Sequence, residues 1–409
     1  MRHRVADVYK AGVLAARLER HDGGTKFSYL PAYLAAGGPA VASSLPLSTE
    51  PVLSAAGAAP PYFTGLLPEG RRLNALRRSV KTSVDDELSL LIAAGANPVG
   101  DVQIVGHGEP LDPDEHAVEL NPKAPVDFDA LLGDSGLIDP VALAGVQDKL
   151  SAGMISMPVA SAGRRYILKL NAPEFPHVVE NELVMFRYAA KLRIPLSRVR
   201  LIRDVEGRPG LLVERFDRIP LAGGAHGAVQ RLAVEDGAQV LALYPADKYN
   251  VAYGRVCHAL AEYCAAPLPA LRNLAIQAAF AWLSGNGDLH AKNVSMVQQP
   301  SGEWSIAPVY DIPSTVVYGD KTLALTLDGK RTGISRKHFL GWATGLGLAE
   351  RAAVQVLELG LKASGPLVAD LERGAAFAGT NDDGASPFSA MVTRSWLKEL
   401  KHRRRLLEG

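Results

Sequence analysis

The hydrophobic pattern of the first hundred residues predicts a small mixed subdomain. The segment "VADVYKAGVLAARLER" alternates partly between apolar and polar positions around Gly12, which is typical of a β-hairpin. The later segment "SVDDELSLLIAAGA" has a helical pattern, with Ser83 expected as the N-cap, acidic residues in the first turn and Gly95 at the end. "NPVGDVQIV" then predicts a strand. We therefore predict an α+β subdomain over residues 1–107.

A second, longer part of the chain begins after residues 108–126. That stretch carries prolines and acidic residues with little periodicity, and we interpret it as a linker. Beyond it, "AGRRYILKLN" and "SRVRLIRDVEGRPGLLVERFDR" predict strands, with the helix "VVENELVMFRYAAKL" between them. Most of the chain after residue 248 has a helical pattern. We predict a strand-rich part over 127–217 and a mostly helical lobe over 218–409.

Composition restricts the class of protein more than its activity. Of 409 residues, 47% are apolar, which is enough for several cores, and the net charge of +1 favours neither nucleic acid nor membranes. Cys257 and Cys264, seven apart in a predicted helix, lie about 10 Å from each other, too far for a disulfide. The apolar window 274–285 is too short to span a bilayer, and the first residues lack a signal peptide's apolar core. We expect a cytoplasmic protein without membrane contact.

The segment "SGNGDLHAKNVSM" carries the first candidate chemistry. It places Asp288 and Asn293 five residues apart on a glycine-framed loop, the spacing found in the catalytic loop of protein kinases. A carboxylate can accept the proton of an attacking hydroxyl, and an amide oxygen can bind Mg²⁺ without adding charge. Asp311 in "PVYDIPS" could complete the metal site. Each residue alone could simply close a turn, but the ordered set of three favours a magnesium site.

Two further polar residues lie inside this loop. His290 is expected to hold the loop through hydrogen bonds, with a role as ligand or acid/base as the alternative. Lys292 could reach a transferring phosphate and offset its charge, or could simply be solvated. The sequence leaves both choices open.

Upstream segments carry what a nucleotide would need. Lys169 could pair the α- and β-phosphates, held by an ion pair from Glu182 in the following helix. The segment "LLVERFDR" could bind an adenine edge with its backbone near Glu214 to Phe216. In "LAGVQDKLSAGM" glycines would let backbone N–H groups approach phosphates, although an ordinary hairpin is the alternative there.

These segments together resemble the HipA-type serine/threonine kinase toxins of bacterial toxin–antitoxin modules. The likeness is carried by "LAGVQDK", "ILKL", "VENE", "VERFDR", "GDLHAKNVSM" and "PVYDI", and by "YFTGLLPEG" with "NPVGDVQIV" near the start. The resemblance implies a two-lobed kinase-like fold with an N-terminal α+β subdomain, a nucleotide-binding part over 127–217 and a catalytic lobe over 218–409.

The resemblance also assigns residues. Asp288 would be the catalytic acid/base, with Lys292 and Asn293 beside it, and Asn293 and Asp311 would bind Mg²⁺. Lys169 would contact the phosphates of ATP. The other residues assigned to the nucleotide are Gly145, Val146, Gln147, Asp148, Lys149, Glu182, Glu214, Phe216 and His290.

The implied activity is ATP- and Mg²⁺-dependent phosphorylation of a serine or threonine, on an aminoacyl-tRNA synthetase in well-known members, with growth arrest as the result. The implied partner is a small helix-turn-helix antitoxin, HipB-like, through which alone the protein would contact DNA as a co-repressor. Ala142 stands where members often carry an autophosphorylated serine, and Ser151 is out of register. We therefore hypothesise that the partner, rather than autophosphorylation, restrains toxicity.

Three alternatives stay open at this point. A metal-dependent hydrolase could use Asp288, His290 and Asp311 as transition-metal ligands, although Lys169 would then have no role. A catalytically inactive kinase fold could act as an interaction module, but every catalytic position is filled. The basic segment "RSWLKELKHRRRLLEG" is expected to be a solvated helix face, with a DNA contact as the alternative.

Overall fold

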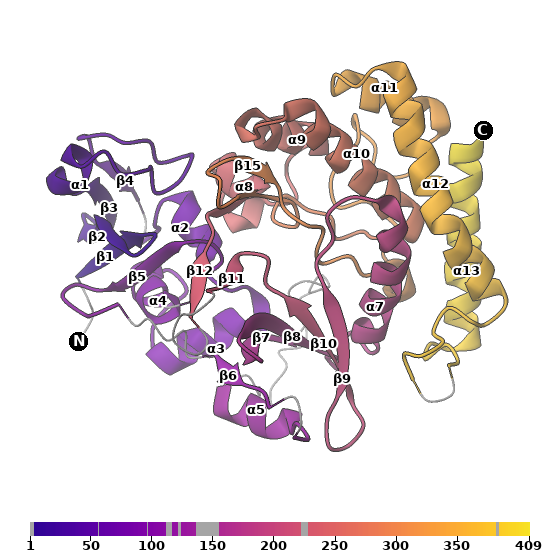
Figure 1. The fold of residues 1–409 in the computed structure, drawn as a ribbon, viewed down its shortest axis with the longest axis horizontal. Coiled ribbons are helices and arrows are strands. Elements are labelled where there is room, and N and C mark those ends of the chain that lie inside the picture. Colours follow the sequence, from indigo (N-terminus) through magenta and orange to yellow (C-terminus); the bar gives the residue numbers. More distant parts are fainter. Residues whose placement is uncertain are drawn as a thin grey trace.

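The N-terminal domain is built on a five-stranded antiparallel sheet. The computed structural model describes residues 4–55, 57–95, 97–111, 117–121, 124–135, 155–221, 228–381 and 384–409. The strand order is β4-β3-β2-β1-β5, so the first three strands form a meander and the fifth returns to pair with the first (Figure 1). The bounds are β1 Val5–Lys10, β2 Val13–His21, β3 Gly24–Tyr29, β4 Val52–Ser54 and β5 Val102–Gly106.

The predicted hairpin at the start of the chain is confirmed. β1 and β2 pair antiparallel, and Gly12 at the bend has φ +80°, a conformation that glycine adopts without steric cost. The alternating apolar residues of these strands face the helices of the domain and form its core with them. The helices are α1 Pro31–Ala35, α2 Pro61–Leu66, α3 Gly70–Val80 and α4 Glu87–Ala94.

The N-cap of α4 differs from the prediction. Asp86, not Ser83, occupies this position, and its carboxylate accepts the backbone N–H of Ser89. The Asp86 carboxylate also accepts hydrogen bonds from Thr82 and Arg20. Burial alone would raise the pKa of Asp86, but these hydrogen bonds outweigh it and lower the pKa to about 2. A serine three residues earlier closes a short turn with Asp85 instead. The N-cap of α4 is therefore the Asp86 carboxylate, paired with Arg20, and not the Ser83 hydroxyl.

A second five-stranded sheet forms the strand-rich lobe. Its order is β6-β7-β8-β10-β9, with helix α5 (Phe128–Ser135) beside it. β6 lies inside residues 108–126, the stretch interpreted as a linker, and pairs parallel with β7, so this part of the chain belongs to the sheet. The two strands joined by a Glu-Gly-Arg-Pro turn are confirmed as β9 and β10. The bounds are β6 Val118–Glu119, β7 Ile155–Ser161, β8 Arg164–Leu170, β9 Val199–Arg203 and β10 Pro209–Glu214.

Helix α7 (Val178–Ala189) lies between the sheet and the helical lobe. The sequence suggests one apolar stripe along it, but every residue of the helix except Arg187 is buried. Val179 and Leu183 pack against β10, whereas Phe186 belongs to the core of the helical lobe. A helix that is buried on all sides holds its polar residues in fixed positions, which matters for Glu182.

The C-terminal lobe is mostly helical, as predicted. Its helices pack around α10, whose apolar stretch is almost wholly buried (Figure 1). The lobe's bounds are α8 Gly237–Val240, α9 Tyr253–Tyr263, α10 Pro267–Ser284, α11 Arg336–Gly345, α12 Glu350–Glu372 and α13 Ala390–Glu408, with short helices η1 Ala190–Leu192, η2 Pro245–Asp247 and η3 Val316–Tyr318. None of the helices in the described part of the chain is both long and apolar enough to cross a bilayer. Both cysteines are free and buried, and burial raises the pKa of Cys264 to about 11.

A small three-stranded sheet carries the loop of interest. Its order is β13-β14-β15, and β14 follows directly after the segment "GDLHAKN" that leaves α10. The bounds are β13 Val234–Asp236, β14 Ser295–Gln298 and β15 Trp304–Ile306, and a separate pair is formed by β11 Arg218–Pro220 and β12 Val229–Arg231. The loop is thus fixed at one end by the lobe's central helix and at the other by a strand.

A buried cluster of charges joins the N-terminal domain to the strand-rich lobe. The Asp217 carboxylate accepts hydrogen bonds from Arg215 (2.7 Å), Arg218 (2.7 Å) and the backbone N–H of Gly100 (2.9 Å). Both guanidinium groups also donate to the Pro98 carbonyl. Burial alone would raise the pKa of Asp217, but the two arginines outweigh it and hold the pKa well below its usual range. The segment after α4 is therefore held against the end of β10.

Candidate active site

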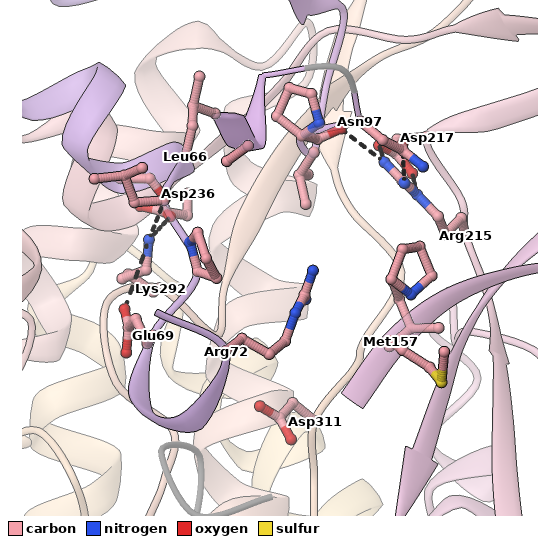
Figure 2. Close-up of a pocket in the computed structure, with 18 of the residues that line it drawn as sticks. Leu66, Glu69, Arg72, Asn97, Met157, Arg215, Asp217, Asp236, Lys292 and Asp311 are labelled. Carbon is pink, nitrogen blue, oxygen red and sulfur yellow. Dashed lines mark hydrogen bonds and ion pairs between the residues drawn. The ribbon is translucent and has the colours of Figure 1, made fainter. Parts of the chain in front are cut away.

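A cavity of about 1120 Å³ lies where the N-terminal domain and the two lobes meet. Its walls come from the segment between α2 and α3, from α3 itself, from β7, β8 and the end of β10, and from the loop after α10 (Figure 2). Seven of the residues predicted for a nucleotide or metal line it: Lys169, Glu214, Phe216, His290, Lys292, Asn293 and Asp311. The fold thus brings together residues that are up to 142 positions apart in the chain.

Lys169 lies at the centre of a three-residue charge cluster. Its ammonium nitrogen is 2.8 and 2.9 Å from the two carboxylate oxygens of Glu182 and 3.0 Å from Oδ1 of Asp311. The alternation of β8 turns Lys169 away from the apolar face formed by Leu168 and Leu170. Burial alone would lower the pKa of Lys169, but the charges of Asp311 and Glu182 outweigh it and raise the pKa. The predicted Lys169–Glu182 ion pair is therefore present, and Asp311 joins it.

Asp311 adopts a backbone conformation that is unusual for a residue with a side chain. Its φ is +55°, in the left-handed region, where a residue other than glycine is strained by roughly 1–2 kcal/mol. This turn aims the carboxylate at Lys169, 3.0 Å away. Strained backbone of this kind gathers at functional sites, where the surrounding structure imposes it.

The loop after α10 is folded by bonds between its own polar groups. Gly285, at φ +77°, ends the helix, and a Cβ there would lie 2.6 Å from a Val316 methyl group. The Asn293 side-chain amide then donates to the Asp288 carbonyl at 2.7 Å. This bond closes the five-residue interval and leaves the amide oxygen of Asn293 as the group available to a cation. The spacing that sequence analysis singled out is therefore a structural unit.

The Asp288 carboxylate lies behind the pocket wall. It is 2% exposed, its Oδ1 accepts a hydrogen bond from the Tyr249 hydroxyl at 2.9 Å, and it is not among the residues that line the cavity. Its neighbours His290 and Asn293 do line the cavity. Asp288 is thus held at the edge of the site by a tyrosine that sequence analysis did not identify.

His290 holds the loop, as expected. Its Nδ1 accepts the backbone N–H of Lys292 at 3.2 Å, and its ring packs edge-on against Tyr249 with the centroids 4.9 Å apart. Its Nε2 is 3.9 Å from the Asp288 carboxylate. His290 therefore holds the loop through its hydrogen bond to Lys292 and its contact with Tyr249.

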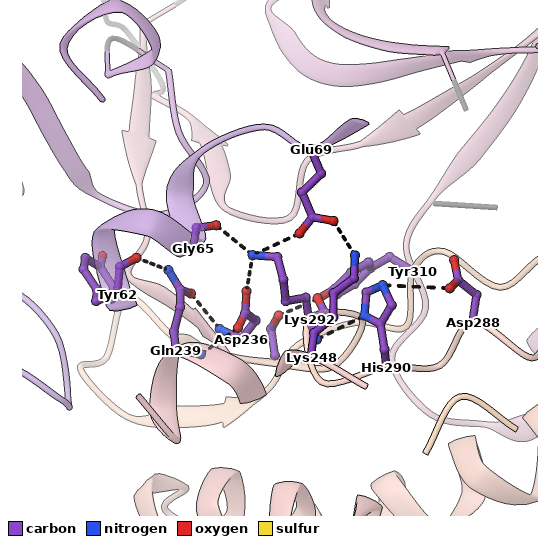
Figure 3. A network of polar contacts seen from close by, with 11 residues as sticks. Tyr62, Gly65, Glu69, Asp236, Gln239, Lys248, Asp288, His290, Lys292 and Tyr310 are labelled. Atoms are coloured by element: carbon purple, nitrogen blue, oxygen red, sulfur yellow. Dashed lines mark hydrogen bonds and ion pairs between the residues drawn. The ribbon is translucent and has the colours of Figure 1, made fainter. Parts of the chain in front are cut away.

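Lys292 is not solvated, so that alternative was wrong. Its ammonium group donates to the Gly65 carbonyl at 2.7 Å and to Asp236 at 3.1 Å, and its side chain is 13% exposed (Figure 3). Burial would lower the pKa of Lys292, but Asp236 and Glu69 outweigh it and raise the pKa. Glu69 also pairs with Lys248. Lys292 of the loop and Lys248 beside η2 therefore both connect the helical lobe to the N-terminal domain.

The end of β10 and the residues that follow it also line the cavity. Glu214 pairs with Arg164 at 2.5 Å, and the Phe216 ring lies 5.7 Å from the Tyr310 ring. The backbone amides of Glu214 and Arg215 already donate to carbonyls within the protein. A base bound here would therefore contact other groups of the segment, such as the Phe216 ring.

The predicted phosphate loop lies outside the described residues. Gly145, Val146, Gln147, Asp148 and Lys149 all fall within 136–154, as does Ala142. Their assignment remains a prediction.

Sequence analysis missed several residues that shape the site. Arg215 and Asp217 lie in the segment predicted to bind an adenine edge, and they form the buried cluster described above. Asp236 caps α8 in a capping box with Gln239, and this Asp-x-x-Gln spacing was a signal available in the sequence. Glu69 and Tyr249 had no local signal, because their partners are 179 and 39 residues away.

The geometry does not favour the hydrolase alternative. Within the described residues, no group of three or more His, Cys, Asp and Glu side chains is placed to hold a metal ion. Asp288 and Asp311 instead contact different neighbours, Tyr249 and Lys169. One carboxylate and one amide oxygen, from Asp311 and Asn293, are the donors that remain, and Mg²⁺ is commonly bound by few protein oxygens.

Comparison with known proteins identifies two matching regions. Residues 6–105 match the HipA N-terminal domain, and residues 141–363 match the HipA-like C-terminal domain. The first region contributes Pro98 and Gly100 to the buried cluster at Asp217, and the second region contributes Asp217 and its two arginines.

Individual relatives agree with these matches. The candidate kinase Y4mE of Sinorhizobium fredii is 32% identical over 74% of this chain and 75% of its own length. The serine/threonine-protein kinase toxin HipA of Shewanella oneidensis is 27% identical over 72% of this chain and 73% of its own length. A solved structure of HipA from the latter organism, in complex with HipB and operator DNA, superposes with a TM-score of 0.77 at 20% identity. That superposition covers 98% of this chain and 97% of the other, so the two share a fold.

Proposed function

Because the chain belongs to the HipA family of serine/threonine kinases, we propose that it transfers the terminal phosphoryl group of Mg-ATP to a serine or threonine of another protein. The observation that carries this proposal is the contact of Lys169 with both Glu182 and Asp311 at one wall of the cavity. A lysine, a buried carboxylate and a strained aspartate in this order are the parts with which a kinase positions phosphates.

The residues present suit magnesium. Asp311 has a carboxylate oxygen beyond the one that contacts Lys169, and the amide of Asn293 is oriented by its bond to the Asp288 carbonyl. Both would offer oxygen ligands, which Mg²⁺ prefers, and the ion would supply positive charge next to the phosphates. Lys169 would contact the α- and β-phosphates, with Glu182 holding its ammonium group in place.

Asp288 would act on the acceptor. In the reaction the oxygen of the acceptor hydroxyl bonds to the terminal phosphorus, the bond from that phosphorus to the bridging oxygen breaks, and ADP leaves. Asp288 would take the hydroxyl proton, and Tyr249 and Asn293 keep this aspartate in position. The Asp288 carboxylate does not line the cavity but its neighbour His290 does, so we propose that the acceptor hydroxyl reaches Asp288 beside His290.

The finer biology is part of the same proposal. We propose that the protein acts as the toxin of a type II toxin–antitoxin module, with a small HipB-like helix-turn-helix antitoxin as partner and co-repressor. The solved HipA structure with HipB and operator DNA supports this partner. An aminoacyl-tRNA synthetase is the proposed acceptor, and we propose that the protein acts in the cytoplasm. With alanine at position 142, we further propose that the antitoxin restrains the kinase.

A transfer assay with radiolabelled ATP and a cell lysate tests the activity. We expect the wild-type protein to label a lysate protein in the presence of Mg²⁺ and to be inactive without it. Asp288→Asn is expected to lower the rate about 100-fold or more while Mg-ATP still binds, because only the proton acceptor is lost.

Asp247→Asn is the matched control. Asp247 is an exposed aspartate whose carboxylate contacts Asn250, so this variant should transfer phosphate at the wild-type rate. Equal transfer by Asp288→Asn would remove Asp288 from its role. Hydrolysis that needs a transition metal and no nucleotide would instead support the hydrolase.

A further inference from the structure

Two cations of the N-terminal domain, Arg72 and Arg78 of α3, line the cavity. Arg72, in the first turn of α3, lines the same cavity as Lys169, Asn293 and Asp311. Figure 2 shows its side chain extending from α3 into the cavity, above Asp311 in that view. A residue outside the two kinase lobes therefore reaches the wall where phosphates are proposed to bind.

Among the residues that the structure describes, Arg72 differs from three other cations of the cavity in having no anionic partner. The ammonium group of Lys169 contacts Glu182 and Asp311, that of Lys292 contacts Asp236, and the guanidinium of Arg215 contacts Asp217. Among the described residues, the Arg72 guanidinium makes no hydrogen bond or ion pair, and Figure 2 draws no contact to it. The charges of the other three are already compensated within the protein, whereas that of Arg72 is available to a ligand.

The surroundings of Arg72 favour an incoming anion. Burial and the nearby charge of Arg215 both lower the pKa of Arg72, so the folded protein disfavours this cation. An arginine nevertheless stays charged in proteins, and a buried charge without a partner costs free energy until an anion joins it. The planar guanidinium can bind two oxygens of one phosphate at once, which a lysine cannot do.

We propose that Arg72 binds the terminal phosphate of the bound nucleotide and thereby completes the site from the N-terminal domain. This inference rests on the proposed function, because it needs a triphosphate held by Lys169 and Asp311. Arg72 forms no covalent bond in the transfer. Its guanidinium offsets the negative charge of the phosphoryl group while the bond to ADP breaks and the bond to the acceptor oxygen forms.

Binding of two nucleotides by matched variants tests this role. We would titrate ADP and a non-hydrolysable ATP analogue, both with Mg²⁺, into wild-type protein, Arg72→Gln and Arg77→Gln. Arg77 lies on the same helix but does not line the cavity. We expect Arg72→Gln to lower the affinity for the analogue about 10- to 100-fold, because a charged hydrogen bond is lost, and to change the affinity for ADP little. Arg77→Gln should match the wild-type protein for both nucleotides.

Each other result has a definite meaning. If the wild-type protein binds neither nucleotide, the proposed function fails and this inference fails with it. If it binds both and Arg72→Gln does too with unchanged affinity, only the inference is overturned. If Arg72→Gln loses affinity for ADP and for the analogue equally, Arg72 maintains the shape of the cavity and does not bind the terminal phosphate, and the inference is overturned as well.

A second variant covers the case in which Arg72→Gln does not fold. Arg72→Lys keeps the charge and the aliphatic stem but cannot bind a phosphate through two parallel hydrogen bonds. We expect Arg72→Lys to bind the analogue several-fold more weakly than the wild-type protein does, with little change in its affinity for ADP. Analogue affinity equal to that of the wild-type protein would overturn the inference.

Discussion

Asp311 combines a strained backbone conformation with a contact to Lys169 at the cavity. Its left-handed backbone, at φ +55°, costs the fold some stability, and the orientation that results brings the carboxylate within 3.0 Å of Lys169. A second aspartate, Asp328, has a similar φ of +45° but is exposed and does not line the cavity. The same local conformation therefore occurs both at the cavity and at an exposed position away from it.

This pair of aspartates yields a prediction about nucleotide binding. Asparagine tolerates the left-handed region, so Asp311→Asn should keep the local backbone and change the free energy of unfolding by no more than about 1 kcal/mol. Without the carboxylate, the affinity for Mg-ATP should fall at least about 10-fold, because the metal loses a charged ligand. Calorimetric titration measures this affinity, and Asp328→Asn should match the wild-type protein. Unchanged Mg-ATP affinity in Asp311→Asn would exclude Asp311 as a metal ligand.

At the level of secondary-structure elements, the end of α2 and the turn that follows it contact the helical lobe at the loop after α10 and at Lys248. The Gly65 carbonyl and the Glu69 carboxylate contact Lys292 and Lys248, which belong to the helical lobe. These contacts cross from one domain to another and bury the lysines that make them. The N-terminal domain is therefore part of the site rather than an appendage.

A double-mutant cycle measures how strongly these elements are coupled. Glu69→Gln and Lys248→Met, alone and together, should reveal a coupling of about 1 kcal/mol in the free energy of unfolding, because Lys248 is 8% exposed. The exposed pair Lys401–Glu372 is the control and should couple by less than about 0.5 kcal/mol. Urea denaturation supplies all the values. Equal couplings at the two pairs would show that Glu69 does not fix the loop.

Prediction from the sequence succeeded where an element depends on its own residues. The hairpin at Gly12, the alternation of β8 and the five-residue interval from Asp288 to Asn293 all follow from local pattern and spacing. It failed where a partner lies far along the chain. Lys292 was left open between two roles, because its contacts at Gly65 and Asp236 are 227 and 56 residues away.

For the molecule as a whole, the buried charge cluster at Asp217 holds the N-terminal domain against the rest. Its three side chains, including Arg215 and Arg218, are each no more than 5% exposed. The sequence places these charges at a strand end, but only the packing of two domains shows that they are buried together. The cavity depends on this packing, because α3 forms one of its walls.

The cluster predicts a dependence of stability on pH. The folded protein lowers the pKa of Asp217, so its contribution is fully present above the unfolded pKa of about 3.9 and is lost as the pH falls below it. Asp217→Asn should therefore lower the free energy of unfolding by about 3–5 kcal/mol at pH 7. This gap in stability between the wild-type protein and the variant should narrow below about pH 4. Urea denaturation between pH 7 and pH 3 measures the gap. A gap that stays constant over this range would mean that Asp217 does not act through its charge.

The central claim is that both lobes and the N-terminal domain converge on one magnesium-bound triphosphate. A crystal structure with Mg²⁺ and a non-hydrolysable ATP analogue tests it most directly. We predict a metal ion about 2.0–2.1 Å from oxygens of Asn293 and Asp311, with the ammonium group of Lys169 on the phosphates. A nucleotide bound away from this cavity, or a metal ion that neither Asn293 nor Asp311 touches, would contradict the account.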